Sequence, residues 1–236
     1  MAYEDFTVDT LAAYLHLTPS QVTKLAEREK IPARKVSGQW RFSPADVHHW
    51  LEDRLGLQEE EKLAHVEQVL TESAPSDESE LSIAGTLAVT AIAIPLEART
   101  RRSVIDSMAE LAAQGGMLWD APAMAEAVLS REDMQPTALD NGVALLHPRR
   151  PMSNILAEPV LALGITHQGI PFGGARGRLT DIFFLICSTE DRMHLRTLAR
   201  LSRMITGDEF LDSLRSASDA GEVHERIAAR EAEVDE

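Results

Sequence analysis

The sequence predicts two folded parts: a small N-terminal module of short helices with a β-hairpin, and a larger C-terminal α/β domain. In the first part, apolar residues at helical spacing precede a glycine-containing turn between two strand-like runs. In the second part, from about residue 82 to residue 217, helix-like and strand-like patterns alternate, which is typical of a layered α/β architecture. An acidic stretch separates the two parts and indicates a linker.

The N-terminal module is predicted from capping and turn signals. The run TPSQ (18–21) combines a capping threonine, a proline at the first helical position and a glutamine that can reach back to the cap. A second helix is therefore expected to begin at Pro19, shortly after a first helix that ends near Leu17. Serine and glycine at 37–38 predict a hairpin, and Ser-Pro at 43–44 starts a third helix. Two short helices joined by a tight turn form a helix-turn-helix unit.

Residues from Phe6 to Leu55 resemble the excisionase-type helix-turn-helix domain, a relative of the MerR-like winged DNA binders. The matching run is FTVDTLAAYLHLTPSQVTKLAEREKIPARKVSGQWRFSPADVHHWL. The resemblance implies that the second helix enters the major groove and that the wing touches the DNA backbone. Gln21 and Arg28 are then expected to read base edges and Lys24 to meet a phosphate. The full set expected to contact DNA is Ser20, Gln21, Lys24, Arg28, Lys35 and Arg41. The alternative is a protein-binding module whose basic side chains are merely solvated.

Charge divides the chain into regions. The whole sequence carries a formal net charge of −15, which argues against a nucleic-acid coat protein or a polybasic membrane anchor. Residues 20–42 are locally basic, with six Lys or Arg against two Glu, whereas residues 57–80 hold eight acidic residues and one Lys. We therefore expect a helix-turn-helix domain over 1–56, an acidic linker over 57–80, an α/β domain over 81–217 and an acidic tail over 218–236 that forms an exposed and frayed helix.

The composition also limits the compartment and the class of protein. A single cysteine excludes an intramolecular disulfide framework and a cysteine-based zinc finger. The first residues show neither a basic start nor an apolar core of a signal peptide, and the most apolar stretch (81–96) is too short and too polar to span a bilayer. A cytoplasmic protein without a membrane segment is expected.

The C-terminal domain is predicted from its short apolar runs. VALL (143–146), PVLALG (159–164) and DIFFLIC (181–187) are typical of buried strands. Helices are expected over 100–113, from Asp120 to about Ser130, and over 193–205, where apolar residues share one face.

Two histidines and an arginine of this domain suggest a site. His147 directly follows a predicted strand, where loops and ligands meet, and Arg131 lies sixteen residues earlier at a helix end. His194 opens the helix after the last strand and shares the apolar face of Leu198 and Leu201, so it is expected to point inward. Imidazole is a nucleophile at neutral pH, and guanidinium offers forked donors to phosphoryl oxygens.

The runs REDMQPTALDNGVALLHPRRP, GIPFGGARGRLTDIFFLIC and EDRMHLRTLARLSRM resemble the IIA domain of the sugar phosphotransferase system, of the fructose/mannitol and nitrogen-regulatory type. The resemblance covers about 81–217 and implies a mixed sheet flanked by helices. It implies that His147 accepts a phosphoryl group, with His194, Arg131 and Asn141 in the same site. One departure concerns the loop, because the family usually has proline directly before this histidine, where the chain has Leu146.

The resemblance also implies partners and leaves two functions open. The phosphoryl donor would be the histidine-containing phosphocarrier protein, and a separate IIB domain is a further expected acceptor. No cofactor and no metal are expected, because the chain has no HExxH or CxxC pattern. GGARGR (173–178) is interpreted as a turn, and Cys187 as a small buried residue. One hypothesis is a phosphocarrier and regulator; the other is a transcription regulator whose IIA domain only senses or dimerises. An apolar stripe within 55–70 suggests a homodimer.

Overall fold

The computed structural model describes residues 5–15, 17–44, 46–47, 50–51, 81–174 and 177–235. The chain divides into two compact units, Met1–Ser79 and Glu80–Glu236, which are considered separately. The expected acidic linker and the apolar stripe proposed for pairing lie outside the described residues.

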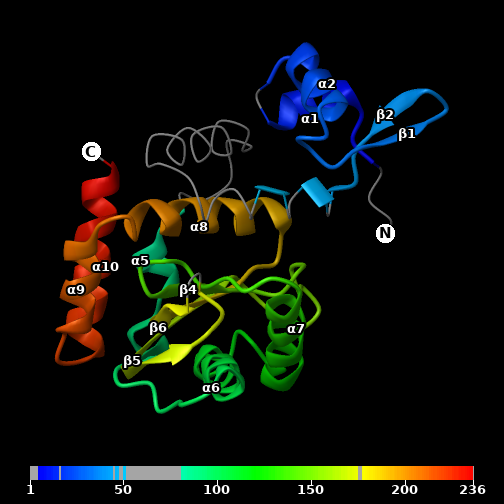
Figure 1. The fold of residues 1–236 in the computed structure, drawn as a ribbon. Helices are drawn as coiled ribbons and strands as arrows, with labels where there is room; N and C mark the ends of the chain where they lie inside the picture. The colour runs from blue at the N-terminus through cyan, green and yellow to red at the C-terminus, as the bar shows by residue number, and fades with distance from the viewer. Residues whose placement is uncertain are drawn as a thin grey trace. The chain divides into compact units, whose positions relative to one another are not determined.

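The N-terminal unit has the predicted helices and hairpin (Figure 1). Its elements are α1 (Val8–Tyr14), α2 (Pro19–Glu27), β1 (Arg34–Val36) and β2 (Gln39–Arg41). The expected cap of α2 is present: Thr18 Oγ1 accepts from the backbone N–H of Gln21, and Gln21 Oε1 accepts from the backbone N–H of Thr18. Both helices begin with such reciprocal caps, which satisfy N–H groups that have no partner within the helix.

A small core holds this unit together. Leu11 of α1, Val22 of α2, Phe42 and Val47 are fully buried. Phe42 also pairs through its backbone with Phe6, so the strand after the wing closes onto the start of the domain. The core thereby fixes the orientation of α2 and anchors the base of the wing.

The C-terminal unit is a mixed four-stranded sheet covered by helices (Figure 1). Its elements are α5 (Ile83–Thr86), the 3-10 turn η1 (Val89–Ala91), β3 (Ile92–Ala93), α6 (Arg101–Ala113), α7 (Ala121–Met134), β4 (Val143–Leu146), β5 (Val160–Pro171), β6 (Leu179–Cys187), α8 (Asp191–Met204), α9 (Asp208–Arg215) and α10 (Ala220–Asp235). The strand order is β3-β5-β6-β4, in which β4 runs parallel and β5 antiparallel to β6. The α/β class and the mixed sheet are confirmed.

The two faces of the sheet are covered by different helices. Side chains alternate along a strand, so Ala144 and Leu146 of β4 face α6 and α7 in one apolar core, together with Phe183 and Leu185 of β6. The intervening residues of β4 face the other way, toward the side on which Figure 1 shows α8. The next residue in this alternation after Leu145 is His147, so the strand itself aims His147 at the α8 side.

β5 is longer than the apolar run predicted. It continues to Pro171 and forms a hairpin with β6, with an irregularity in register between Ile165 and Ile170. At the turn, Gly173 has φ +93°, and a Cβ there would lie 2.5 Å from the Pro136 side chain. Only glycine permits this close approach, which packs the hairpin turn against the segment that follows α7.

The C-terminal segment corrects one expectation. Residues 220–235 form a helix, as expected, but the helix has a buried face that includes Val223 and Ile227 and is therefore not an exposed and frayed one. Glu231 of this helix accepts hydrogen bonds from Ser82 Oγ (3.1 Å) and from the backbone N–H groups of Ile83 (2.6 Å) and Ala84 (2.9 Å). The acidic composition misled the prediction, because Glu231 is a buried cap of α5 and forms an ion pair with Arg200.

Candidate functional site

His147 lies buried at the carboxyl end of β4. Its Nδ1 is 2.8 Å from the carbonyl oxygen of Leu145. A carbonyl oxygen can only accept, so Nδ1 donates this hydrogen bond and, in the neutral ring, Nε2 carries the lone pair. The backbone of β4 therefore selects one tautomer and holds the ring in one orientation.

His194 lies beside His147. The two ring centroids are 4.9 Å apart and the ring planes are tilted by 55°. His194 is buried on the first turn of α8, as its place on the face of Leu198 and Leu201 predicted. Its Nδ1 is 3.4 Å from Ser188 Oγ, a hydroxyl that directly follows β6. The ends of two parallel strands and the start of α8 thus bring both imidazoles together.

Arg131 and Glu132 are buried at the carboxyl end of α7. Arg131 Nη1 donates to the carbonyl oxygen of Gln135 (2.6 Å). The Glu132 carboxylate accepts from the backbone N–H and the hydroxyl of Thr137. These bonds hold the turn that follows α7. Beyond this turn, Ala138 pairs with Ala144 of β4, the strand that leads to His147.

Burial raises the pKa of Glu132, because the carboxylate loses hydration. The hydrogen bonds from Thr137 and the positive charge of Arg101 oppose this rise. His147 also lies within electrostatic reach of Glu132, the residue that follows Arg131 in the sequence.

Asn141 does not join this group. Its Nδ2 donates to the carbonyl oxygen of Ile205 (3.0 Å), at the end of α8 opposite His194. Asn141 precedes β4 and His147 follows it, so the turn at Gly142 (φ +87°) and the length of β4 lie between them. The side chain fastens the far end of α8 to the sheet, so the structure does not bring Asn141 together with His147.

Neither the single cysteine nor a cluster of metal-ligating side chains supplies a further site among the described residues. Burial raises the pKa of Cys187 to about 12, so the thiol stays protonated, which fits a small buried residue. Among the described residues, no group of three His, Cys, Asp or Glu side chains could hold a metal ion.

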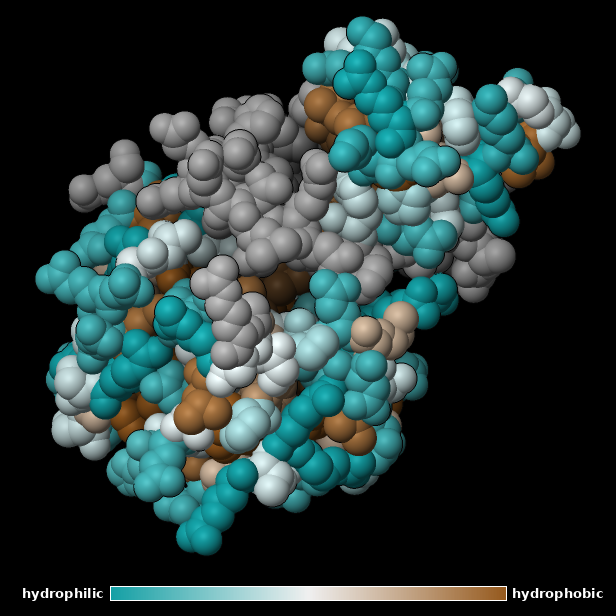
Figure 2. Space-filling view, in the orientation of Figure 1, coloured by the Kyte–Doolittle hydropathy of each residue, from teal (hydrophilic) through white to brown (hydrophobic). Residues whose placement is uncertain are grey.

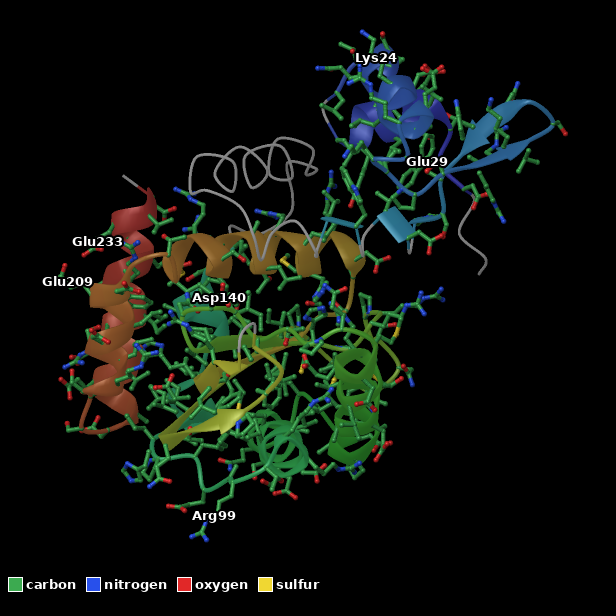
Figure 3. The ribbon with its side chains drawn as sticks, viewed as in Figure 1. Lys24, Glu29, Arg99, Asp140, Glu209 and Glu233 are labelled. Atoms are coloured by element: carbon green, nitrogen blue, oxygen red, sulfur yellow. The ribbon has the colours of Figure 1, made fainter. Side chains whose placement is uncertain are left out.

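The expected DNA contacts lie mostly on one exposed surface. Ser20, Gln21, Lys24 and Arg28 are exposed on or next to α2, opposite the buried Val22, and Lys24 extends outward from the helix (Figure 3). The side-chain oxygen Oε1 of Gln21 accepts hydrogen bonds from Thr18 in the helix cap, which leaves the side-chain amide nitrogen of Gln21 for any base contact. The face of this unit seen in Figure 2 is largely hydrophilic, as befits a polar ligand.

The wing divides its two predicted contacts between opposite faces. Lys35 is paired with Trp40 across the hairpin, and its Nζ lies 4.7 Å from the centroid of the Trp40 ring. Arg41 is paired with Arg34, on the other face. Because neighbouring residues of a strand point to opposite sides, Lys35 and Arg41 cannot meet the same phosphate.

A family model of the EIIA 2 component of the phosphoenolpyruvate-dependent sugar phosphotransferase system matches residues 86–230, which is more than half of the chain. The chain belongs to this family. A helix-turn-helix domain model matches residues 6–55. The EIIA 2 match includes most of α10, in agreement with the buried face of that helix.

Relatives of the EIIA 2 domain have two kinds of name. A fructose-specific EIIABC component from Bacillus subtilis is 29% identical over 53% of this chain, a match that spans only 20% of that protein. A nitrogen regulatory protein from Bradyrhizobium diazoefficiens is 29% identical over 52% of this chain and 80% of its own length. The crystal structure of nitrogen regulatory protein IIA-Ntr from Neisseria meningitidis shares the fold, with a TM-score of 0.56 and 20% identity over 61% of this chain and 98% of that one.

Three side chains near the candidate sites were missed by the sequence reasoning. Glu132 directly follows Arg131, and this adjacency to a predicted site residue was the signal that could have identified it. Ser188 directly follows β6 and lies six residues before His194, so the short connection from β6 to α8 was the available signal. Arg34 depends in the same way on the register of the wing.

Proposed function

We propose that the EIIA 2 domain accepts a phosphoryl group on His147 from the histidine-containing phosphocarrier protein, and that the helix-turn-helix domain binds DNA. The buried pair of His147 and His194 is the observation that carries the first half of this proposal. No helix among the described residues is long and apolar enough to cross a membrane. The proposal places the protein in the cytoplasm, where both the phosphocarrier protein and DNA are found.

The geometry supports attack by Nε2 of His147. Nδ1 is bonded to the Leu145 carbonyl, so the lone pair of Nε2 forms the new P–N bond while the bond from phosphorus to the donor's histidine nitrogen breaks. Arg131 and His194 supply positive charge to the phosphoryl oxygens, which need stabilisation as the group passes between the two rings.

The full chain, incubated with phosphoenolpyruvate, enzyme I and the phosphocarrier protein, tests this proposal. Mass spectrometry is expected to show one acid-labile phosphoryl group per chain. Absence of phosphate on this chain, in a reaction that phosphorylates a known IIA protein, would favour the alternative of a transcription regulator whose EIIA 2 domain only senses or dimerises.

Arg131→Ala and His194→Ala are each expected to slow phosphoryl transfer about 100- to 1000-fold, the effect typical of losing one charge-stabilising donor. Rapid-quench kinetics measure the rate, and circular dichroism checks that the fold is retained. Arg99→Ala is the control, because Arg99 is exposed and lies on the opposite side of the EIIA 2 domain from α8 (Figure 3). Rates equal to the control in both variants would remove the proposed partners of His147.

We also propose that phosphorylation changes DNA affinity. A phosphoryl group on His147 adds negative charge two and three residues from the exposed Arg149 and Arg150. A single helix-turn-helix makes few phosphate contacts, so one copy binds DNA weakly and a dimer on paired half-sites binds more tightly. In this proposal the new negative charge changes the geometry of that dimer. For this role the relatives named as nitrogen regulatory proteins are the model, rather than the fructose-specific component. A separate IIB domain is a further acceptor to test for the phosphoryl group.

Fluorescence anisotropy at fixed salt compares both forms of the chain on one specific DNA duplex. The two affinities are expected to differ by about 5-fold or more, the lower range of allosteric coupling. His147→Ala treated with the same phosphoryl donor is the matched control, and it should bind like the unphosphorylated chain. Equal affinities for both forms would show that the domains act independently.

A further inference from the structure

The wing carries two arginines side by side on one face. In the antiparallel register, Arg34 of β1 lies directly opposite Arg41 of β2. Cβ atoms of opposed residues are about 5 Å apart, so two like charges at such a pair destabilise the hairpin unless an anion lies between or beside them. The wing has only three residues per strand, so it offers little other packing to offset such a repulsion, and the surroundings of the two arginines decide whether it is compensated.

Both guanidinium groups are held by acceptors of the same small domain. Asp5 Oδ2 accepts from Arg34 Nη2 (2.6 Å) and Nε (3.3 Å). Gln39 Oε1 accepts from Arg41 Nη2 (2.9 Å), and the Trp40 carbonyl accepts from Nη1 (3.1 Å). Each guanidinium has five N–H donors, so these contacts orient the groups and leave other donors for an anion.

The Asp5–Arg34 pair is suited to exchange. The Arg34 side chain is 67% exposed, whereas the Asp5 side chain is 21% exposed. Water reaches the Arg34 guanidinium, which limits the net stability that the ion pair contributes. An incoming anion can therefore approach Arg34 from the solvent and compete with Asp5, whereas Arg41 is already held in place by uncharged acceptors.

The ligand class follows from the donors. Two adjacent, forked guanidinium groups match the oxygens of a single phosphate better than the carboxylate of a flexible side chain. The same domain exposes Lys24 and Arg28 on and next to α2. A polyanion such as DNA would therefore find basic groups both at the wing and at α2.

We propose that Arg34 and Arg41 together bind one phosphodiester of the DNA backbone, and that Asp5 occupies Arg34 until DNA replaces it. This inference rests on the proposed DNA binding and adds a site to it. It puts the wing contact on the face opposite Lys35, and it makes Asp5 an internal competitor of DNA.

A salt titration of the full chain tests the clamp. The probe is a mixed-sequence DNA duplex, and affinity is measured by anisotropy between about 50 and 200 mM salt. Because both arginines share one phosphate, Arg34→Gln and Arg41→Gln are each expected to weaken binding but to reduce the slope of log K against log salt by less than about 0.9, the value of one phosphate contact. The Arg34→Gln/Arg41→Gln double variant should lose that one contact, so its slope should fall by about 0.9 rather than about 1.8. Asp5→Asn should bind more tightly than the wild type.

Lys30→Gln is the matched control, because it removes one exposed positive charge from the same domain outside the wing. Thermal unfolding checks that each variant is folded. A slope unchanged in the Arg34→Gln/Arg41→Gln double variant, or reduced by Lys35→Gln instead, would overturn the clamp while DNA binding stands. Wild-type protein that binds the duplex at no salt concentration would refute the proposed DNA binding and the clamp with it.

Discussion

His147→Ala is expected to abolish phosphorylation of the chain by the phosphocarrier protein. His147 is the imidazole whose tautomer is set by its own strand, through the bond from Nδ1 to the Leu145 carbonyl. Alanine removes the nucleophile, so no P–N bond can form, and the loss should be complete rather than partial. Mass spectrometry of the reaction mixture measures the phosphoryl group directly.

His167→Ala is the control, because His167 is exposed on β5 and belongs to no part of the site. The position of the phosphoryl group adds a second check. Nuclear magnetic resonance of the phosphorylated chain with ¹⁵N-labelled histidine should show coupling of phosphorus to Nε2. Phosphate retained after His147→Ala would move the acceptor elsewhere, and coupling to Nδ1 would contradict the tautomer that the structure selects.

Glu231→Ala is expected to destabilise the EIIA 2 domain by about 3 kcal/mol. The change leaves Ser82 Oγ and the N–H groups of Ile83 and Ala84 without their acceptor, and it removes one carboxylate partner of Arg200. Buried donors that lose their acceptor keep the full cost of their lost hydration.

Hydrogen exchange followed by mass spectrometry is the suitable measurement, because it reports on α5 and α10 separately from the N-terminal domain. Faster exchange is expected in both helices. Glu233→Ala is the control: Glu233 lies on the same helix, its side chain is 65% exposed (Figure 3) and its ion pair with Arg230 is of the weak surface kind. Equal exchange in the two variants would show that the cap of α5 carries no stability.

The sequence was sufficient to predict an element where its apolar residues form a continuous run or recur at helical spacing. Short apolar runs identified β4 and β6, and helical spacing identified the inward face of α8 that carries His194. These elements place both histidines, because a strand end and a helix start leave few directions for a side chain. The motifs around His147 and His194 then supported the family, which the match over residues 86–230 confirms.

The sequence was insufficient where placement depends on pairing between distant segments. Asn141 was grouped with His147 by motif, yet β4 separates them along its length and Asn141 binds the end of α8. Glu231 looks like a solvated charge in an acidic run, and its role becomes visible only when residues 82–84 are beside it. The facing of Arg34 and Arg41 likewise follows from the register of the hairpin, which shifts with a single residue.

The cap that joins Glu231 to residues 82–84 also sets an order of events during synthesis. Its acceptor lies 149 residues after the Ser82 hydroxyl that it binds, and a ribosome covers that distance in roughly 7 to 30 s at about 5–20 residues per second. Throughout that interval the N–H groups of Ile83 and Ala84 are hydrated, and the local cap from Ser82 Oγ to the N–H of Gly85 is what α5 has to start it. The helix-turn-helix domain is complete long before then. Each newly made molecule thus acquires its helix-turn-helix domain first and the finished EIIA 2 domain last.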